Sequence, residues 1–444
     1  MTRKHLLDLD KAGRPGRVRI LAGLGVWLAV AITGLASVEP AAARTAGALA
    51  AGMIAVTTTV DDFGDDPGQC SLREAIQAIS TTQSFGGCPA GMPGDVIELP
   101  AGSYALTISG TEDDTNATGD LDLWVTMTVQ AVDGRAIIDA GGLGVRDRVL
   151  DVHAGAVSLV DLTVTGGDVS AAALSSRVGG GLLNTTALTL TRVDVHGNAG
   201  GAGGGLFNAA RLGTGLVMVD SQVMNNSAQY GAGVYNNQAA LTIINSSIVS
   251  NSASQLAGGL YNDDIRGVVF LRNTTLSGNN VTLGQGGGLF NVGALRLNNV
   301  TLTANHAGSA GGVFSGGSLL VSNSLIGGNT ADAGATDCSG QLQSLGYNLV
   351  KDTTECELTG VLPTLMTGLN PGLGSLGLNV GRTLTHALLP DSPALDRGNP
   401  ALPTGAGDTC ETVDQRGSPR QGWCDLGAYD AADPWRVWMP SIQR

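Results

Sequence analysis

The sequence predicts an all-β protein, a right-handed single-stranded parallel β-helix with disulfide-bearing caps. A short glycine-rich phrase recurs six times, at steps of 24, 28, 26, 29 and 24 residues. Between the copies, aliphatic and polar residues alternate as in strands, and no helical spacing is sustained. The chain of 444 residues contains 67 glycines and only 4% aromatic residues, which is typical of a backbone that turns often.

Each repeat consists of two phrases. The first phrases are GGGLLN (179–184), GGGLFN (203–208), GAGVYN (231–236), AGGLYN (257–262), GGGLFN (286–291) and AGGVFS (310–315). A single repeat buries about half a dozen aliphatic side chains, worth roughly 1.5–3 kcal/mol each. Ordering its backbone costs about 1–2 kcal/mol per residue. Because a single repeat cannot fold alone, we expect stacked coils that share one core.

The second phrase of each repeat ends in asparagine. These residues are Asn198, Asn226, Asn251, Asn279, Asn305 and Asn329. Asparagine tolerates left-handed backbone at a turn and forms hydrogen bonds along a stack of identical neighbours. We interpret the six residues as a structural ladder, and not as glycan acceptors or catalytic groups.

An aromatic row accompanies the first phrase. Its members, which precede the last residue of the phrase, are Phe207, Tyr235, Tyr261, Phe290 and Phe314, with Leu183 in the first copy. Alternation puts this position and the preceding Leu or Val on opposite faces of a strand. We place the aliphatic residue inside and the aromatic row outside, exposed, where it would bind sugar rings or another protein. The alternative is a row that packs under turn loops or lies inside.

The N-terminal segment is typical of an export signal. A basic stretch ending at Arg19 precedes an uncharged run over 20–38 and small residues at 41–43. We predict a signal peptide over 1–43 that is cleaved; the alternative is an uncleaved membrane anchor. The mature chain would have 18 basic and 35 acidic side chains, a net charge of −17, and no transmembrane span. This charge excludes nucleic acid as a favoured partner and leaves divalent cations or glycans.

The six cysteines fall into three close pairs in the sequence. The pairs are Cys70 with Cys88, Cys338 with Cys356, and Cys410 with Cys424. In an exported protein this pattern predicts three local disulfides. Zinc binding is disfavoured because CxxC and HxxxH spacings are absent.

Three motifs carry a resemblance to a known family. CSLREAI (70–76), followed by TGDLDL (118–123) and DRVLDV (147–152), resembles the N-terminal signature of the CSLREA-domain family. The repeats are similar to those of polymorphic outer-membrane proteins. Toward the C-terminus, DQRGSPR (414–420) and CDLGAYD (424–430) resemble the choice-of-anchor Q domain. The resemblance implies a secreted or cell-surface β-helix without a settled activity.

These observations predict a division of the chain. The expected parts are a signal peptide (1–43), an N-terminal CSLREA-type cap (44–120), parallel β-helix repeats (121–350), a choice-of-anchor Q-like region (351–432) that closes the other end, and a tail (433–444). The tail departs from the family pattern because it has neither an LPxTG-like signal nor an apolar anchor.

No catalytic motif stands out, although parallel β-helices also include pectate lyases and polysaccharide hydrolases. The repeats contain no recurrent acidic position, and four histidines (His153, His196, His306 and His386) are scattered, which we interpret as turn or surface residues. Oxygen-rich clusters that suit calcium lie before the repeats. The candidate ligands are Asp113, Asp114, Asp120 and Asp122, with Glu112 and Asn116 nearby; Asp61, Asp62, Asp65 and Asp66 form a second group. The alternative is a solvated acidic loop.

The sequence therefore favours a non-catalytic secreted or cell-surface protein, adhesin-like or structural, that binds glycans. The alternative is a polysaccharide lyase or glycoside hydrolase acting on an extracellular polysaccharide. No cofactor other than Ca²⁺ is suggested by the residues.

Overall fold

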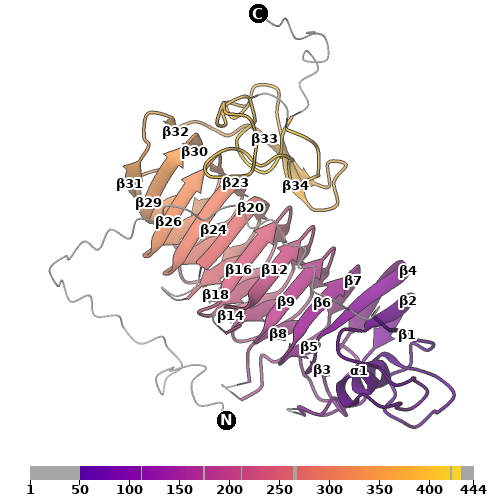
Figure 1. The fold of residues 1–444 in the computed structure, drawn as a ribbon. Helices are drawn as coiled ribbons and strands as arrows, with labels where there is room; N and C mark the ends of the chain where they lie inside the picture. The colour runs from indigo at the N-terminus through magenta and orange to yellow at the C-terminus, as the bar shows by residue number, and fades with distance from the viewer. Residues whose placement is uncertain are drawn as a thin grey trace, which may run out of the picture.

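The computed structural model describes residues 51–431, apart from 112, 174–175, 212, 264–267 and 421–422. These residues form a parallel β-helix of stacked coils, so the predicted fold is confirmed (Figure 1). The predicted signal peptide and tail lie outside the described residues. Within the described part, no helix is long and apolar enough to cross a membrane.

Three parallel faces make up the helix. The first contains β3 (Leu121–Leu123), β5 (Leu150–Val152), β8 (Leu182–Asn184), β11 (Leu206–Asn208), β15 (Val234–Asn236), β19 (Leu260–Asn262), β22 (Leu289–Asn291), β25 (Val313–Ser315) and the start of β29 (Cys338–Gly346). The second contains β1 (Met53–Ala55), β2 (Val96–Ala105), β4 (Met127–Asp139), β6 (Ala156–Val160), β9 (Ala187–Thr191), β12 (Gly215–Val219), β16 (Ala240–Ile244), β20 (Val268–Ser277), β23 (Ala294–Thr303), β26 (Ser318–Ser322), the middle of β29 and β31 (Glu355–Gly360).

The third face contains the ends of β2, β4, β20 and β23 together with β7 (Leu162–Thr165), β10 (Asp194–His196), β13 (Gln222–Met224), β17 (Ser247–Val249), β27 (Leu325–Ile326), β30 (Asn348–Val350) and β32 (Leu365–Thr367). A smaller sheet lies between the third and first faces. It contains β14 (Ser227–Tyr230), β18 (Ser252–Leu256), β21 (Asn280–Val281), β24 (His306–Ala307) and β28 (Thr330–Ala331).

Strand alternation builds one core along the axis. On the first face, Leu182, Leu206 and Val234 pair in register and are at most 1% exposed. A one-residue shift would turn these side chains outward, so the buried rows fix the register.

A left-handed residue turns the chain between the second and third faces. It recurs in successive coils as Asp161, Arg192, Asp220, Asn245, Asn273, Asn299, Asn323 and Tyr347, with φ between 44° and 58°. Half of these residues are asparagine, which adopts this conformation more readily than most side chains. A single residue at this conformation produces a tight corner that repeats with every coil.

The predicted asparagine ladder is confirmed. From Asn198 to Asn329, each side-chain amide donates to the Oδ1 atom of the next asparagine at 2.9–3.1 Å. The same Oδ1 atoms accept the backbone N–H of the preceding asparagine. Asp337 ends the row by accepting from the Asn329 amide at 2.8 Å. The ladder therefore satisfies buried polar groups that no water reaches.

A second asparagine ladder ends the strands of the first face. Asn184, Asn208, Asn236, Asn262 and Asn291 are linked by amide-to-carbonyl hydrogen bonds of 2.7–3.0 Å, and Ser315 closes the row. We did not predict this ladder, although the final Asn of the first phrase is its signal.

The N-terminal end of the helix is closed by α1 (Leu72–Thr81). Ser71 caps α1 by accepting the Glu74 N–H, and Glu74 in turn accepts the Ser71 N–H. Ile76 and Ile79 of α1 are at most 1% exposed and extend the main core. The segment around Cys70 thus covers the first strands, as expected from the sequence.

The C-terminal region lies along the flank of the helix, which differs from the expected end cap (Figure 1). Its antiparallel hairpin of β33 (Leu373–Gly377) and β34 (Thr385–Leu388) and the following loops bind the asparagine corners. Asn273 donates to the Val413 carbonyl at 2.7 Å, and Glu411 N–H donates to Asn299 at 2.9 Å.

All three predicted disulfides are present. They join Cys70 with Cys88, Cys338 with Cys356, and Cys410 with Cys424. The second links two adjacent coils, and the third holds loops of the C-terminal region together.

We predict that Asn251→Ala lowers the free energy of unfolding by about 2–4 kcal/mol, because it leaves the buried backbone N–H of Asn226 and one of the two N–H groups of its side-chain amide without an acceptor. Chemical denaturation followed by circular dichroism measures the change. Ser252→Ala, at an exposed position on β18, is the matched control. Equal unfolding midpoints for the two variants would show that the ladder contributes nothing.

Candidate functional site

The aromatic row lies outside the main core, on the outer side of the first face. Its rings stack at centroid distances of 4.7–5.0 Å from Phe207 to Phe314. The expectation of an exposed row is wrong: Phe207, Tyr235, Tyr261 and Phe290 are 1–8% exposed, and Phe314 is half-buried. Tyr230 and Leu256, at the ends of β14 and β18, pack against the row. The smaller sheet thus covers the rings, so they cannot bind sugars.

The same outward position holds carboxylates in the first two coils. Asp122 of β3 pairs in register with Asp151 of β5, and Asp151 pairs with Leu183, where the aromatic row begins. The side chains of Asp122 and Asp151 are each 1% exposed. Stacking therefore brings together two aspartates that lie a full coil apart in sequence.

Two cations and two further carboxylates complete an acidic cluster. Its members are Asp120, Asp122, Asp147 and Asp151, with Arg148 and His153. Arg148 Nη1 lies 3.2 Å from Asp120 Oδ2 and 2.9 Å from Asp151 Oδ2. His153 Nε2 lies 2.6 Å from Asp122 Oδ1, and the imidazole stacks on Trp124 at 4.0 Å. His153, interpreted from sequence as a turn or surface residue, is therefore part of the cluster.

Burial dominates the electrostatics of the cluster. It raises the pKa of Asp120 well above its ordinary value, and Arg148 offsets this only in part. Burial also raises the pKa of Asp122, against the hydrogen bond from His153, and that of Asp147, against the charge of Arg148. For His153, burial opposes protonation, but the Asp122 hydrogen bond and the charge of Asp151 raise its pKa overall. The cluster thus retains protons more strongly than free side chains do.

The remaining predicted calcium ligands have other surroundings. Asp113 accepts hydrogen bonds from the backbone N–H groups of Thr115, Ala117 and Thr118 at 2.8–3.0 Å, so it shapes its own loop. An oxygen of Asp114, which is exposed, lies within 4.8 Å of ligand atoms of Asp122 and His153. In the second acidic group, Asp61 forms a buried ion pair with Arg73 at 2.7 Å. Of the four predicted ligands, only Asp120, Asp122 and Asp114 come close to other possible ligands.

A pocket of about 440 Å³ lies beside the acidic cluster. Its walls comprise Thr111, Gly144, Val145, Arg146, Asp147, Arg148, Asp168, Val169, Ala171, Ala172, Ala173 and Ser176. Arg146 pairs with Asp168, and its side chain is 72% exposed. Asp147 and Arg148 belong to both the pocket wall and the cluster, so buried carboxylates lie directly behind the wall. Neither arginine was singled out from the sequence, because they belong to no repeat.

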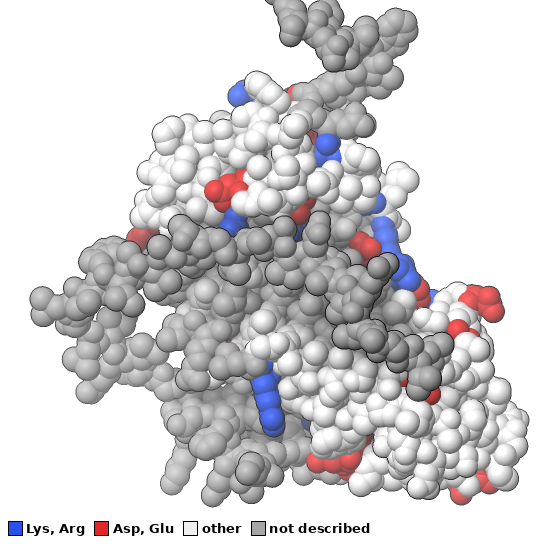
Figure 2. All heavy atoms as spheres, in the orientation of Figure 1, with Lys and Arg blue, Asp and Glu red and all other residues white. Residues whose placement is uncertain are grey.

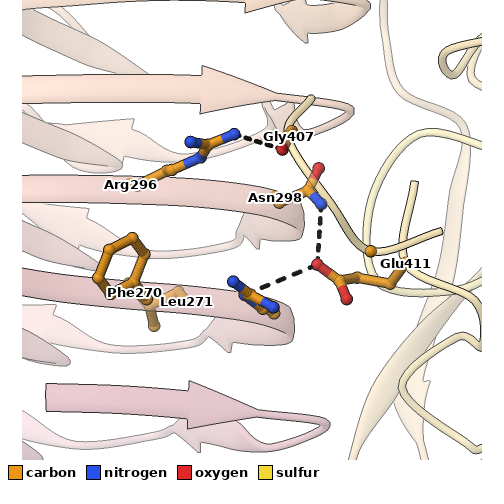
Figure 3. Close-up of a pocket in the computed structure, with 8 residues that line it drawn as sticks. Phe270, Leu271, Arg296, Asn298, Gly407 and Glu411 are labelled. Atoms are coloured by element: carbon orange, nitrogen blue, oxygen red, sulfur yellow. Dashed lines mark hydrogen bonds and ion pairs between the residues drawn. The ribbon is translucent and has the colours of Figure 1, made fainter. Parts of the chain in front are cut away.

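A second recess, between the coils and the C-terminal region, is much smaller (Figure 3). Arg296 donates to the Gly407 carbonyl, and Glu411 accepts from the Asn298 amide at 2.9 Å. Its free volume of about 10 Å³ is at the lower limit of what one water molecule needs. The recess therefore belongs to the attachment of the C-terminal region and is too small for a sugar.

Charged side chains are few and mixed in sign on the described part of the face in Figure 2. Basic and acidic atoms alternate along the right-hand border, and no broad patch of one sign is visible there. This pattern gives a phosphate backbone no continuous basic surface.

Comparison with known proteins adds little beyond the fold. No protein-family model matches the chain, and no curated protein matches it. The crystal structure of pectate lyase Pel9A is similar with a TM-score of 0.43 and 14% sequence identity, over 77% of this chain and 92% of that chain. A similarity of this degree does not identify an activity.

We predict that the protein becomes less stable as the pH rises from about 4 to 8 in the presence of EDTA. Raised pKa values of Asp120, Asp122, Asp147 and His153 mean that the folded state binds more protons than the unfolded state there. Asp120→Asn, which mimics the protonated acid, should unfold near the wild-type temperature at pH 5 and above it at pH 8. Thermal unfolding at both pH values measures this, and an equal loss at both would contradict it.

Proposed function

We propose that the protein is a non-catalytic extracellular β-helix, adhesin-like or structural, that binds glycans beside its first coils. The observation that supports this proposal is the pocket of about 440 Å³ beside the acidic cluster. It offers an exposed guanidinium, Arg146, beside the small apolar side chains of Val169 and Ala171–Ala173. Binding sites for small ligands commonly combine apolar walls with a few polar groups.

An exposed aromatic ring near the cluster supports the same proposal. Trp124, just after β3, is 43% exposed, and its Nε1 donates to the Asp114 carbonyl at 2.9 Å. With one ring face against His153, its orientation is fixed. A rigid, partly exposed indole is suited to stack on a sugar ring. Trp124 thus takes the role first expected of the buried aromatic row.

Several features favour binding without catalysis. A catalytic proton acceptor needs a pKa near the working pH. Burial lowers the pKa of Arg148, but the charges of Asp151 and Asp120 raise it overall, so this arginine stays protonated and cannot accept a proton. A glycosidase needs two accessible carboxylates, about 5–5.5 or 6.5–9.5 Å apart. Those of Asp120, Asp122 and Asp151 are 1–3% exposed. They are therefore too deeply buried for this role.

A polysaccharide lyase or glycoside hydrolase is the second candidate. The observation that favours it is the convergence of Arg146, Asp168 and Asp147 in one pocket beside a strand face. The fold is compatible with both functions.

An extracellular location fits the three disulfides, which are typical of oxidising compartments. The CSLREA and choice-of-anchor resemblance, together with the export-type leader, supports a secreted or cell-surface protein. Attachment to the surface would then involve residues beyond the coils.

We predict that Arg146→Ala and Trp124→Ala each weaken binding to glycans found on an array at least tenfold, as measured by calorimetry. Arg211→Ala, an exposed arginine on another coil, should bind like the wild type. The array is probed with and without calcium, and reducing ends and unsaturated products are assayed in parallel. If the wild type generates reducing ends or unsaturated products and Arg146→Ala does not, the protein is a polysaccharide lyase or glycoside hydrolase instead. Binding unaffected by either substitution would place the glycan elsewhere.

A further inference from the structure

We propose that the acidic cluster binds one divalent cation, calcium, independently of whether the neighbouring pocket binds a glycan. One oxygen from each of Asp120, Asp122 and Asp151 lies within 4.8 Å of the other two. Calcium binds oxygen at about 2.3–2.6 Å, so two ligands on opposite sides of the ion are about 4.8 Å apart. The three oxygens therefore fit around a single ion. They come from two adjacent coils whose register is fixed by strand pairing.

The Asp147 carboxylate is the second, independent indication of a ligand. This residue is 6% exposed, and its Oδ2 atom has no hydrogen-bond donor. The backbone N–H of Asp120 faces the carboxylate but forms no hydrogen bond to Oδ2. Oδ2 lies so close to Gly119 that a Cβ atom there would approach it to 2.6 Å. A buried carboxylate oxygen without a donor, directed at the residue beside Asp120, is favourable only if a cation or a proton occupies the space.

The charge balance of the cluster indicates an ion with two positive charges. Fully ionised, the four buried carboxylates and the two cations, Arg148 and His153, would carry a formal charge of −2. Both cations are already engaged: Arg148 bridges Asp120 and Asp151, and His153 bonds to Asp122. One divalent cation would neutralise the remainder.

The donor chemistry favours calcium over zinc or magnesium. All four candidate ligands are carboxylates. Calcium accepts six to eight oxygen ligands in flexible geometry, whereas magnesium requires near-ideal octahedral geometry and zinc prefers nitrogen or sulfur ligands. The only histidine beside these carboxylates in the described chain, His153, has its Nε2 atom hydrogen-bonded to Asp122.

Calorimetric titration of the EDTA-treated protein with calcium chloride tests the proposal. We expect one ion per chain and a rise of the unfolding temperature by several degrees on saturation. Asp122→Asn and Asp147→Asn should each weaken calcium binding at least tenfold. Asp220→Asn is the matched control, since asparagine retains the left-handed backbone at that corner, and it should bind calcium like the wild type.

Asp147→Asn separates a metal ligand from a purely structural residue. Because it removes one uncompensated charge, it should unfold at the same or a higher temperature than the wild type in EDTA, but lose the stabilisation by calcium. The absence of calcium binding by the wild type would overturn the proposal. Equal calcium affinity in all variants, or binding of zinc or magnesium alone, would also overturn it.

Discussion

The structure depends on each coil lying directly upon the next, with equivalent residues in register. A single coil has too few apolar residues to offset the entropy of ordering its backbone, so its strands are stable only between neighbours. The two asparagine ladders make this register specific, because a shifted coil would leave buried amides without partners. Asp337 ends the first ladder by accepting from Asn329 where the next coil offers no asparagine. The asparagine ladders thus specify the register between neighbouring coils, while the buried aliphatic rows supply most of the stabilisation.

Because the coils are in register, one outward position of the first face recurs in every coil, and the residue type at this position changes along the helix axis. The outward row of the first face reads Asp122, Asp151 and Leu183, and then continues as stacked aromatic rings. In the later coils the smaller sheet covers this row. Before β14, that sheet has no strand in the described chain, and the row faces Arg148, His153 and the pocket wall instead. The change of residue type therefore coincides with the change of neighbours, which explains why the candidate site lies at the N-terminal coils.

The sequence predicted the fold because strand alternation and a fixed repeat length are visible without contacts. The sequence correctly predicted that the aromatic row lies outside the core, but it did not predict that the row is buried. The row is covered by Tyr230 and Leu256, and the repeat spacing does not show where the segments that carry these two residues lie. In the candidate site, Asp120 and Asp122 were predicted because several acidic residues lie close together in that part of the sequence. Asp151 and His153 were missed because only stacking brings them near. A signal existed nevertheless: LDL at 121–123 and LDV at 150–152 repeat one pattern a coil apart.

The left-handed corners explain why the C-terminal region binds the flank. A residue with positive φ at each corner directs its side chain and neighbouring carbonyl away from the axis. Where the corner is asparagine, as at Asn273, Asn299 and Asn323, these groups bond to the C-terminal loops, and the asparagines are at most 1% exposed. Where it is Asp220 or Arg192, the Arg382 guanidinium of the C-terminal region donates to the corner carbonyls. The hydrogen bonds between this region and the corners therefore extend from Asn323 to Arg192, one coil short of the coils that carry the acidic cluster.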